Sequence, residues 1–122
     1  MMNKKQLGYF GENLAANFLL ENNYQILHRN FRCFLGEIDI ISKKENLLIF
    51  VEVKTRMSTV FGMAKEAVAW QKQRKLSKLA EFYLQNYHGN CKLLQPRFDV
   101  IEVYLLKDNE KNYHIVHLEG AF

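Results

Sequence analysis

Asp39, Glu52 and Lys54 stand among apolar residues that are expected to form two buried strands. The segment GEIDIISKKENLLIFVEVKTR, residues 36–56, has the pattern of two strands joined by a short polar turn, yet it contains Asp39, Glu52 and Lys54. Because side chains alternate across a strand, Glu52 and Lys54 project from one face of the second strand and Val53 from the other. Two charged groups are therefore placed together on a strand that should be buried.

The expected hairpin geometry also brings the two acids together. If the chain turns tightly at Glu45-Asn46, residues whose numbers sum to 91 face each other, so Asp39 faces Glu52 and Glu37 faces Lys54. Carboxylates directly opposite each other on a sheet repel, and burying either without a partner costs several kcal/mol. A cationic group should therefore lie beside them.

Two kinds of cation could meet this need. Lys54 could form a structural ion pair with the acids. Alternatively, Mg²⁺ or Mn²⁺ could bind, since these ions prefer oxygen ligands and need only one or two carboxylates when they keep several waters. Such an ion can hold a phosphodiester oxygen and lower the pKa of a bound water, while a lysine orients that water or stabilises developing charge. This alternative is the chemistry of a nuclease.

The same residues resemble a known pattern. Asp39 followed by Glu52-Val53-Lys54 is similar to the PD-(D/E)xK core of restriction-endonuclease-like nucleases, although Ile38 stands where that pattern has proline. The stretches GYFGENLAANFL, YQILHRNFR, GEIDII, FVEVKTR and RFDVIEV together resemble the YraN-type family of small bacterial proteins, which is similar to archaeal Holliday-junction resolvases. The resemblance implies a restriction-endonuclease-like fold and metal-dependent hydrolysis of DNA.

The resemblance also implies roles for individual residues. It makes Asp39, Glu52 and the Val53 carbonyl the ligands of Mg²⁺ or Mn²⁺. It makes Lys54 the catalytic group that orients the attacking water or stabilises charge. Asp39 and Glu52 are catalytic through the ion that they hold.

Glu12 is the remaining candidate catalytic residue. On a helical wheel it falls at the rim of the apolar arc of the first predicted helix, beside Gly8 and Gly11. The missing side chains of these two glycines should let the helix approach the sheet closely. The alternative is that Glu12 is a solvated glutamate at the edge of the helix.

Apolar periodicity predicts the frame that positions these residues. We expect helices over residues 5–22 and 66–87, and strands over residues 24–31, 37–41, 46–55, 97–106 and 112–118. The order αβββαββ predicts an α/β fold of the restriction-endonuclease-like class, with a central mixed β-sheet flanked by helices. A length of 122 residues with 48% hydrophobic content fits a single domain over residues 1–122.

The net charge of +4 is concentrated in one segment. Residues 54–78 hold seven basic residues and one acid, which indicates a polyanionic partner. The expected contacts with DNA are Arg56, Lys65, Gln71, Lys72, Arg74, Lys75 and Lys78. A solvated helix face would explain the last three equally well. Lys72 is unusual because it lies in the buried arc that includes Leu76 and Leu79 of the second helix, where it could snorkel or meet a scissile phosphate.

Two functions stay open. The first is a metal-dependent DNA endonuclease that is selective for branched or processed DNA, and the second is a nucleic-acid-binding module with the nuclease fold but no turnover. The paired carboxylates favour the first, because a protein that only binds DNA has no need of groups that repel phosphate. DNA is the expected partner of a cytoplasmic protein with reduced Cys33 and Cys91, no membrane segment and no small-molecule cofactor. A homodimer, and the roles of Asp99 and Glu37, stay open.

Overall fold

The computed structural model of the chain describes residues 2–57, 70–87, 93–106 and 112–121. These residues form helices and strands in the predicted order: α1 (Lys4–Glu21), β1 (Gln25–Cys33), β2 (Gly36–Lys44), β3 (Leu47–Met57), α2 (Trp70–Asn86), β4 (Gln95–Leu105) and β5 (Tyr113–Leu118). The predicted start of the second helix, residues 66–69, lies outside the described residues. No helix in the described ranges has both the length and the apolar character that crossing a membrane requires.

The strands form a mixed sheet in the order β1-β2-β3-β4-β5. β3 and β4 run parallel, whereas the other neighbouring strands run antiparallel. A parallel pair needs a crossover connection, and the segment between β3 and β4 contains α2. The order αβββαββ and the mixed sheet confirm the predicted α/β class with a central mixed β-sheet.

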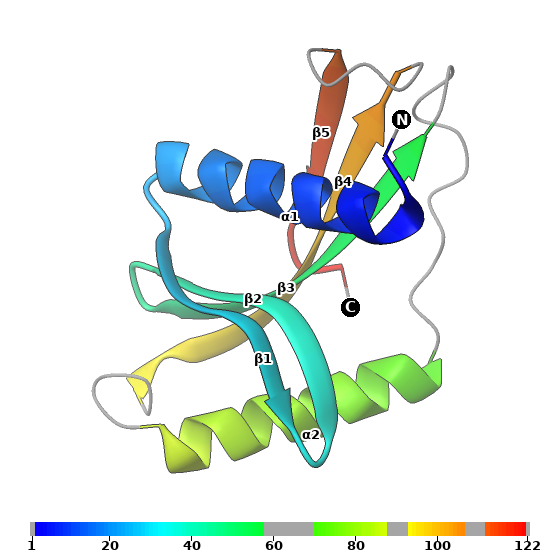
Figure 1. Cartoon of the computed structure of the whole chain (residues 1–122). Helices are drawn as coiled ribbons and strands as arrows, with labels where there is room; N and C mark the ends of the chain where they lie inside the picture. Colours follow the sequence, from blue (N-terminus) through cyan, green and yellow to red (C-terminus); the bar gives the residue numbers. More distant parts are fainter. Residues whose placement is uncertain (1, 58–69, 88–92, 107–111, 122) are drawn as a thin grey trace.

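The hairpin of β2 and β3 has the predicted register over its paired part. Pairing begins beside the Glu45-Asn46 turn and ends at Ile40 and Val51, and the numbers of each pair sum to 91. Beyond this pair both strands continue, but they are no longer paired with each other. Figure 1 shows that β1 and β2 together bend away from β3 beyond this pair, while β3 stays beside β4. The sheet therefore opens between β2 and β3 next to Asp39.

Helices α1 and α2 cover opposite faces of the sheet (Figure 1). Val51 of β3 belongs to the apolar cluster that contains Leu19 of α1, whereas the adjacent Phe50 belongs to the cluster that contains Tyr83 of α2. Because side chains alternate along a strand, odd-numbered residues of β3 face α1 and even-numbered residues face the side of α2. Glu52 therefore projects towards the side of α2.

Candidate active site

Asp39 lies where β2 and β3 separate. Its Oδ2 atom accepts a hydrogen bond from the Val53 backbone N–H at 2.7 Å. Strand pairing ends at Ile40 and Val51, so this N–H would otherwise lose its partner from β2. The Asp39 carboxylate therefore extends the contact between the two strands and is held against β3.

The predicted pairings of Asp39 with Glu52 and of Glu37 with Lys54 are wrong, because the pairing of β2 with β3 ends at Ile40 and Val51. β2 remains paired with β1 at Glu37, which lies opposite Arg32. The two side chains are exposed and form an ion pair at 3.0 Å. The separation of β2 from β3 takes Glu37 away from the strand that carries Lys54, so the register cannot be extended to the ends of the strands.

Glu52 receives its positive partner from α2. Lys72 Nζ forms a hydrogen-bonded ion pair with Glu52 Oε1. Lys72 stands one helical turn before Leu76, which is buried against the sheet, so the lysine extends from the face of α2 that packs there. The other carboxylate oxygen of Glu52, Oε2, is buried and has no hydrogen-bond partner among the described residues.

Lys54 does not provide the compensating ion pair. It is half-buried and forms no hydrogen bond or ion pair with any residue in the described ranges. It stands opposite Glu102 of β4 in the parallel register, and Glu102 is buried. The structure therefore assigns the neutralisation of Glu52 to Lys72, and Lys54 is left as a half-buried cation on the same face of β3.

Glu12 faces the interior of the site rather than solvent. It is only 8% exposed, and its Oε1 atom accepts a hydrogen bond from Arg29 at 3.2 Å. Gly11 allows the close approach of α1, because a Cβ atom at that position would overlap the Thr55 side chain of β3. The prediction for Gly11 is confirmed, whereas Gly8 has no neighbouring atom that a Cβ would meet.

Glu12 and Glu52 both affect the pKa of Asp39. Burial is the largest cause that raises the pKa of Asp39, which reaches about 6, and the negative charges of Glu12 and Glu52 raise it further. The Val53 N–H and the Lys72 ammonium act in the opposite direction. The carboxyl group of Asp39 is still mostly ionised at neutral pH.

Two cavities adjoin Asp39. One of about 190 Å³ also contacts Glu52 and Lys72, on the side of α2. The other, of about 470 Å³, contacts Glu12 and Val53, on the side of α1. Asp39 is therefore accessible from both sides of the opening between β2 and β3.

The larger cavity contains residues that sequence reasoning missed. Lys4, Lys5 and Tyr9 of α1 line it together with Asp39. The sequence signal for the two lysines was their position directly after the helix N-cap Asn3, where basic residues are unfavourable for a helix. That signal was obscured by the larger basic segment at residues 54–78.

The predicted DNA-contacting residues lie in different environments. The exposed ones are in α2: Gln71, Lys72, Arg74, Lys75 and Lys78. Arg56 is half-buried in β3, and Lys65 lies outside the described residues. Lys72 forms an ion pair with the candidate catalytic residue Glu52. The exposed Arg74, Lys75 and Lys78 form a basic surface on α2.

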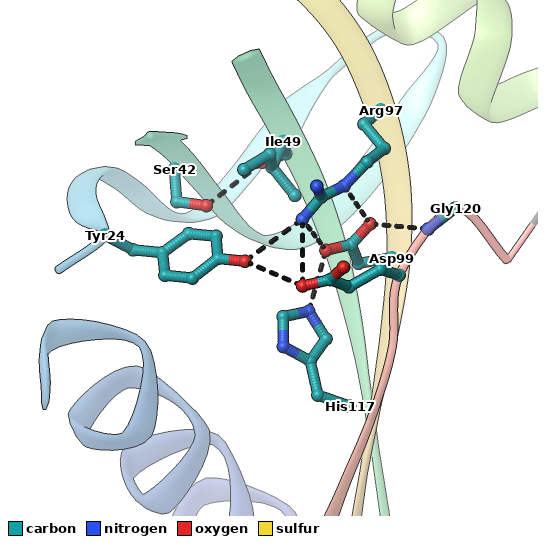
Figure 2. Close-up of polar contacts among 8 residues, drawn as sticks. Tyr24, Ser42, Ile49, Arg97, Asp99, His117 and Gly120 are labelled. Atoms are coloured by element: carbon teal, nitrogen blue, oxygen red, sulfur yellow. Dashed lines mark hydrogen bonds and ion pairs between the residues drawn. The ribbon is translucent and has the colours of Figure 1, made fainter. Parts of the chain in front are cut away.

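Asp99 belongs to a separate polar network, shown in Figure 2. Arg97 donates to both oxygens of its carboxylate, at 2.9 and 2.8 Å, and His117 Nε2 lies 2.7 Å from Oδ2. Gly120 donates its backbone N–H at 3.0 Å. Burial alone would raise the pKa of Asp99, but these hydrogen bonds lower it below its usual range. Asp99, whose role the sequence leaves open, therefore has a structural role, since it ties the segment after β5 to β4.

The donor set of the site fits a hard divalent cation. Asp39 and Glu52 supply carboxylate oxygens, and one of these oxygens is buried without a partner among the described residues. No three acidic, histidine or cysteine side chains in the described part of the chain form a complete metal site. An ion that keeps several waters does not require three such ligands, because one or two carboxylates suffice for Mg²⁺. The residues present are therefore sufficient for such an ion.

Comparison with known proteins gives a consistent set of relatives. The model of "Uncharacterised protein family UPF0102" matches residues 11–103. A UPF0102 protein of Caldicellulosiruptor saccharolyticus is 52% identical over 110 residues, which cover 89% of this chain and 91% of the relative. A UPF0102 protein of Caldanaerobacter subterraneus subsp. tengcongensis is 46% identical over 121 residues, which cover 99% of this chain and 98% of the relative. Among solved structures, a chain of the EndoMS-dsDNA2 complex is similar with a TM-score of 0.39 and 14% identity, over 84% of this chain and 39% of that chain.

Proposed function

The chain belongs to the UPF0102 family, as the YraN-type resemblance implied, and from the geometry of its own site we propose that it is a metal-dependent endonuclease that hydrolyses phosphodiester bonds in DNA. The observation that carries this proposal is the convergence of Asp39, Glu52 and Glu12 where β2 and β3 separate. Acidic groups that repel each other and are partly buried cost stability, so their convergence needs a reason other than folding.

A divalent cation supplies that reason. Asp39, Glu52 and the Val53 carbonyl would hold Mg²⁺ or Mn²⁺, and the buried Glu52 Oε2 atom without a described partner is an available ligand. When bound, the ion would polarise the phosphodiester and lower the pKa of a coordinated water. Glu12 forms an ion pair with Arg29 at 3.2 Å and completes the acidic lining.

The lysines have separate roles in this proposal. Lys54 projects from the same face of β3 as Glu52 and has no described partner, so its ammonium group is available to orient water or to stabilise charge on the phosphate. Lys72 neutralises Glu52 in the metal-free protein and is then available for a phosphate oxygen. The exposed basic residues of α2 bind the DNA backbone, which favours polyanions without reading sequence.

Cleavage assays test this function. Purified protein is incubated with duplex, flap, four-way-junction and single-stranded DNA, in Mn²⁺ or in chelator. We expect cleavage that requires metal and is strongest on a branched or partly unpaired substrate. Asp39→Asn and Glu52→Gln should abolish it, whereas Glu81→Gln, which alters an exposed acid of α2, should cleave like wild type. Metal-independent cleavage, or equal cleavage by Asp39→Asn, would contradict the proposal.

One observation favours a second candidate function. Lys72 already occupies Glu52 Oε1, as an internal cation would in a protein that has no metal. A module that binds DNA through α2 without cleaving it would keep this ion pair in every state. In that case DNA binding would be strong, cleavage would be absent, and Mn²⁺ would leave the melting temperature unchanged.

A further inference from the structure

The cavity on the α1 side of Asp39 combines features that the proposed chemistry leaves unused. Its volume of about 470 Å³ falls within the range of about 300–1,000 Å³ that is typical of small-ligand sites. Its buried and half-buried lining includes Glu12, Asp39 and Val53, which belong to the candidate active site. Its exposed lining includes Lys4, Lys5 and Tyr9. The cavity therefore connects the acidic centre with a basic and aromatic surface.

The two lysines are not explained by the stability of α1. They directly follow the N-cap Asn3, and the first turn of the helix has no acidic residue. The positive end of the helix dipole disfavours cations at this position. Neither lysine forms an ion pair with a described residue, so their ammonium groups are not neutralised within the described part of the chain. Two uncompensated cations at the positive end of a helix form a suitable place for an anion.

Tyr9 supplies a contact of a different kind. Its side chain is 63% exposed although it is large and aromatic, and it lines the same cavity as the two lysines. Aromatic side chains in basic grooves stack on the bases of single-stranded nucleic acids, which is tolerant of sequence. Ammonium groups and an exposed ring next to catalytic acids match the phosphate and the base of a single nucleotide.

We propose that this cavity binds one unpaired nucleotide of the cleaved strand, adjacent to the scissile phosphate, with its phosphate on Lys4 and Lys5 and its base on Tyr9. This proposal rests on the proposed nuclease function. A base inside a duplex is stacked and paired, so it can reach the ring only after it has been unstacked. The cavity therefore makes the enzyme selective for frayed, branched or single-stranded DNA.

Binding measurements in chelator test the proposal without any cleavage. Fluorescence anisotropy is recorded with a labelled oligothymidylate and with a blunt hairpin duplex of equal charge. Tyr9→Ala should weaken binding of the single strand by roughly tenfold, as expected when one base no longer stacks on a ring, and leave duplex binding nearly unchanged. Tyr113→Ala, which removes an exposed tyrosine from β5, is the matched control and should bind both DNAs like wild type.

The double variant Lys4→Glu/Lys5→Glu tests the phosphate contact. It should weaken single-strand binding and reduce its salt slope by roughly 0.7 for each phosphate that the lysines no longer neutralise. Acidic residues are favourable in the first turn of a helix, so the melting temperature should not fall and unfolding cannot explain the weaker binding. Lys43→Glu in β2, at a half-buried lysine that lines neither cavity beside Asp39, is the charge control.

The outcomes separate this proposal from the proposed function. If wild type binds no single strand in chelator, or if Tyr9→Ala weakens both DNAs equally or neither, the nucleotide site is overturned, even when wild type cleaves DNA in Mn²⁺. If Tyr9→Ala loses single-strand binding selectively while wild type cleaves nothing in Mn²⁺, the nucleotide site holds and the nuclease function fails.

Discussion

Lys72 of α2 and Glu52 of β3 form an ion pair that joins the second helix to the acidic centre of the site. The pair occupies one oxygen of Glu52 and leaves the other buried without a described partner. Glu52 is the residue to which we assign a metal ion, so the lysine and the ion would share one carboxylate. In the proposed metal-bound state, this ion pair would link the metal to the position of α2 and its basic surface.

The first prediction concerns this competition. Lys72→Gln should tighten Mn²⁺ binding several-fold, because the ion no longer competes with an ammonium group for Glu52. In chelator the variant should lose about 1 kcal/mol of stability, since the Lys72 side chain is half exposed and such ion pairs are weak. Calorimetric titration with Mn²⁺ and urea unfolding measure the two effects. Lys75→Gln is the control, and equal metal affinities in all three proteins would contradict the competition.

The second prediction concerns the contact between α1 and the sheet. Gly11→Ala should destabilise the protein by about 1–3 kcal/mol or more, because the added Cβ overlaps the Thr55 side chain and pushes α1 away from β3. Gly8→Ala in the same helix has free space and should stabilise the protein by roughly 0.5–1 kcal/mol. Urea unfolding of both variants checks this contrast, and it would be contradicted if the two changes had the same sign.

The third prediction concerns Asp39. Burial raises its pKa from 3.8 to about 6, so the folded state binds this proton more tightly than the unfolded state. The group contributes stability that is present below pH 3.8 and lost as the pH rises through about 6. Asp39→Asn keeps an oxygen that can accept the Val53 N–H and removes the charge. The free energy of unfolding of Asp39→Asn should exceed that of wild type by on the order of 2–3 kcal/mol at neutral pH in chelator. At about pH 4 the two free energies should differ little.

Metal should reverse this order at neutral pH. Only wild type gains binding energy from Mn²⁺, about 4.1 kcal/mol when the ion stands at roughly 1,000 times its dissociation constant, which exceeds the advantage of Asp39→Asn. Urea unfolding of wild type, Asp39→Asn and the control Glu81→Gln at two pH values, with and without Mn²⁺, checks both parts. A less stable Asp39→Asn in chelator, with no effect of metal on wild type, would remove the metal site.

The fourth prediction concerns the exposed face of α2. Arg74→Glu/Lys78→Glu should weaken the binding of all DNAs and flatten the salt dependence, because phosphate contacts act through the release of counterions. Since both side chains are exposed, the fold should be unaffected. Anisotropy at several salt concentrations measures the slope. A salt dependence equal to that of wild type would show that the DNA backbone does not contact Arg74 and Lys78.

The sequence predicted the local part of this structure well. The order of elements follows from apolar periodicity, and the register of β2 and β3 follows from the turn at Glu45-Asn46. Alternation also placed Glu52 and Lys54 on one face correctly. These features depend on neighbours within about ten residues, which is the range over which periodicity carries information.

The rest depends on contacts that a single strand pattern does not contain. The strands separate after Ile40 and Val51, so Glu37 never reaches Lys54, and where twisted strands separate is decided by packing against other elements. The partner of Glu52 comes from a helix later in the chain, and that of Glu12 from β1. The proposed nucleotide cavity is formed by both α1 and β3, which only the fold brings together.

In the proposed function, Asp39 and Glu52 hold a divalent ion that serves phosphodiester hydrolysis, and Lys54 acts on the reaction rather than on the ion. The most direct test is a calorimetric titration of Mn²⁺ into wild type, Asp39→Asn and Lys54→Ala, with DNA cleavage measured on the same preparations. We expect wild type to bind the ion and cleave, Asp39→Asn to do neither, and Lys54→Ala to bind with nearly unchanged affinity while cleavage is abolished. Mn²⁺ binding to Asp39→Asn that equals wild type, or an equal loss of metal affinity in Lys54→Ala and Asp39→Asn, would contradict this account.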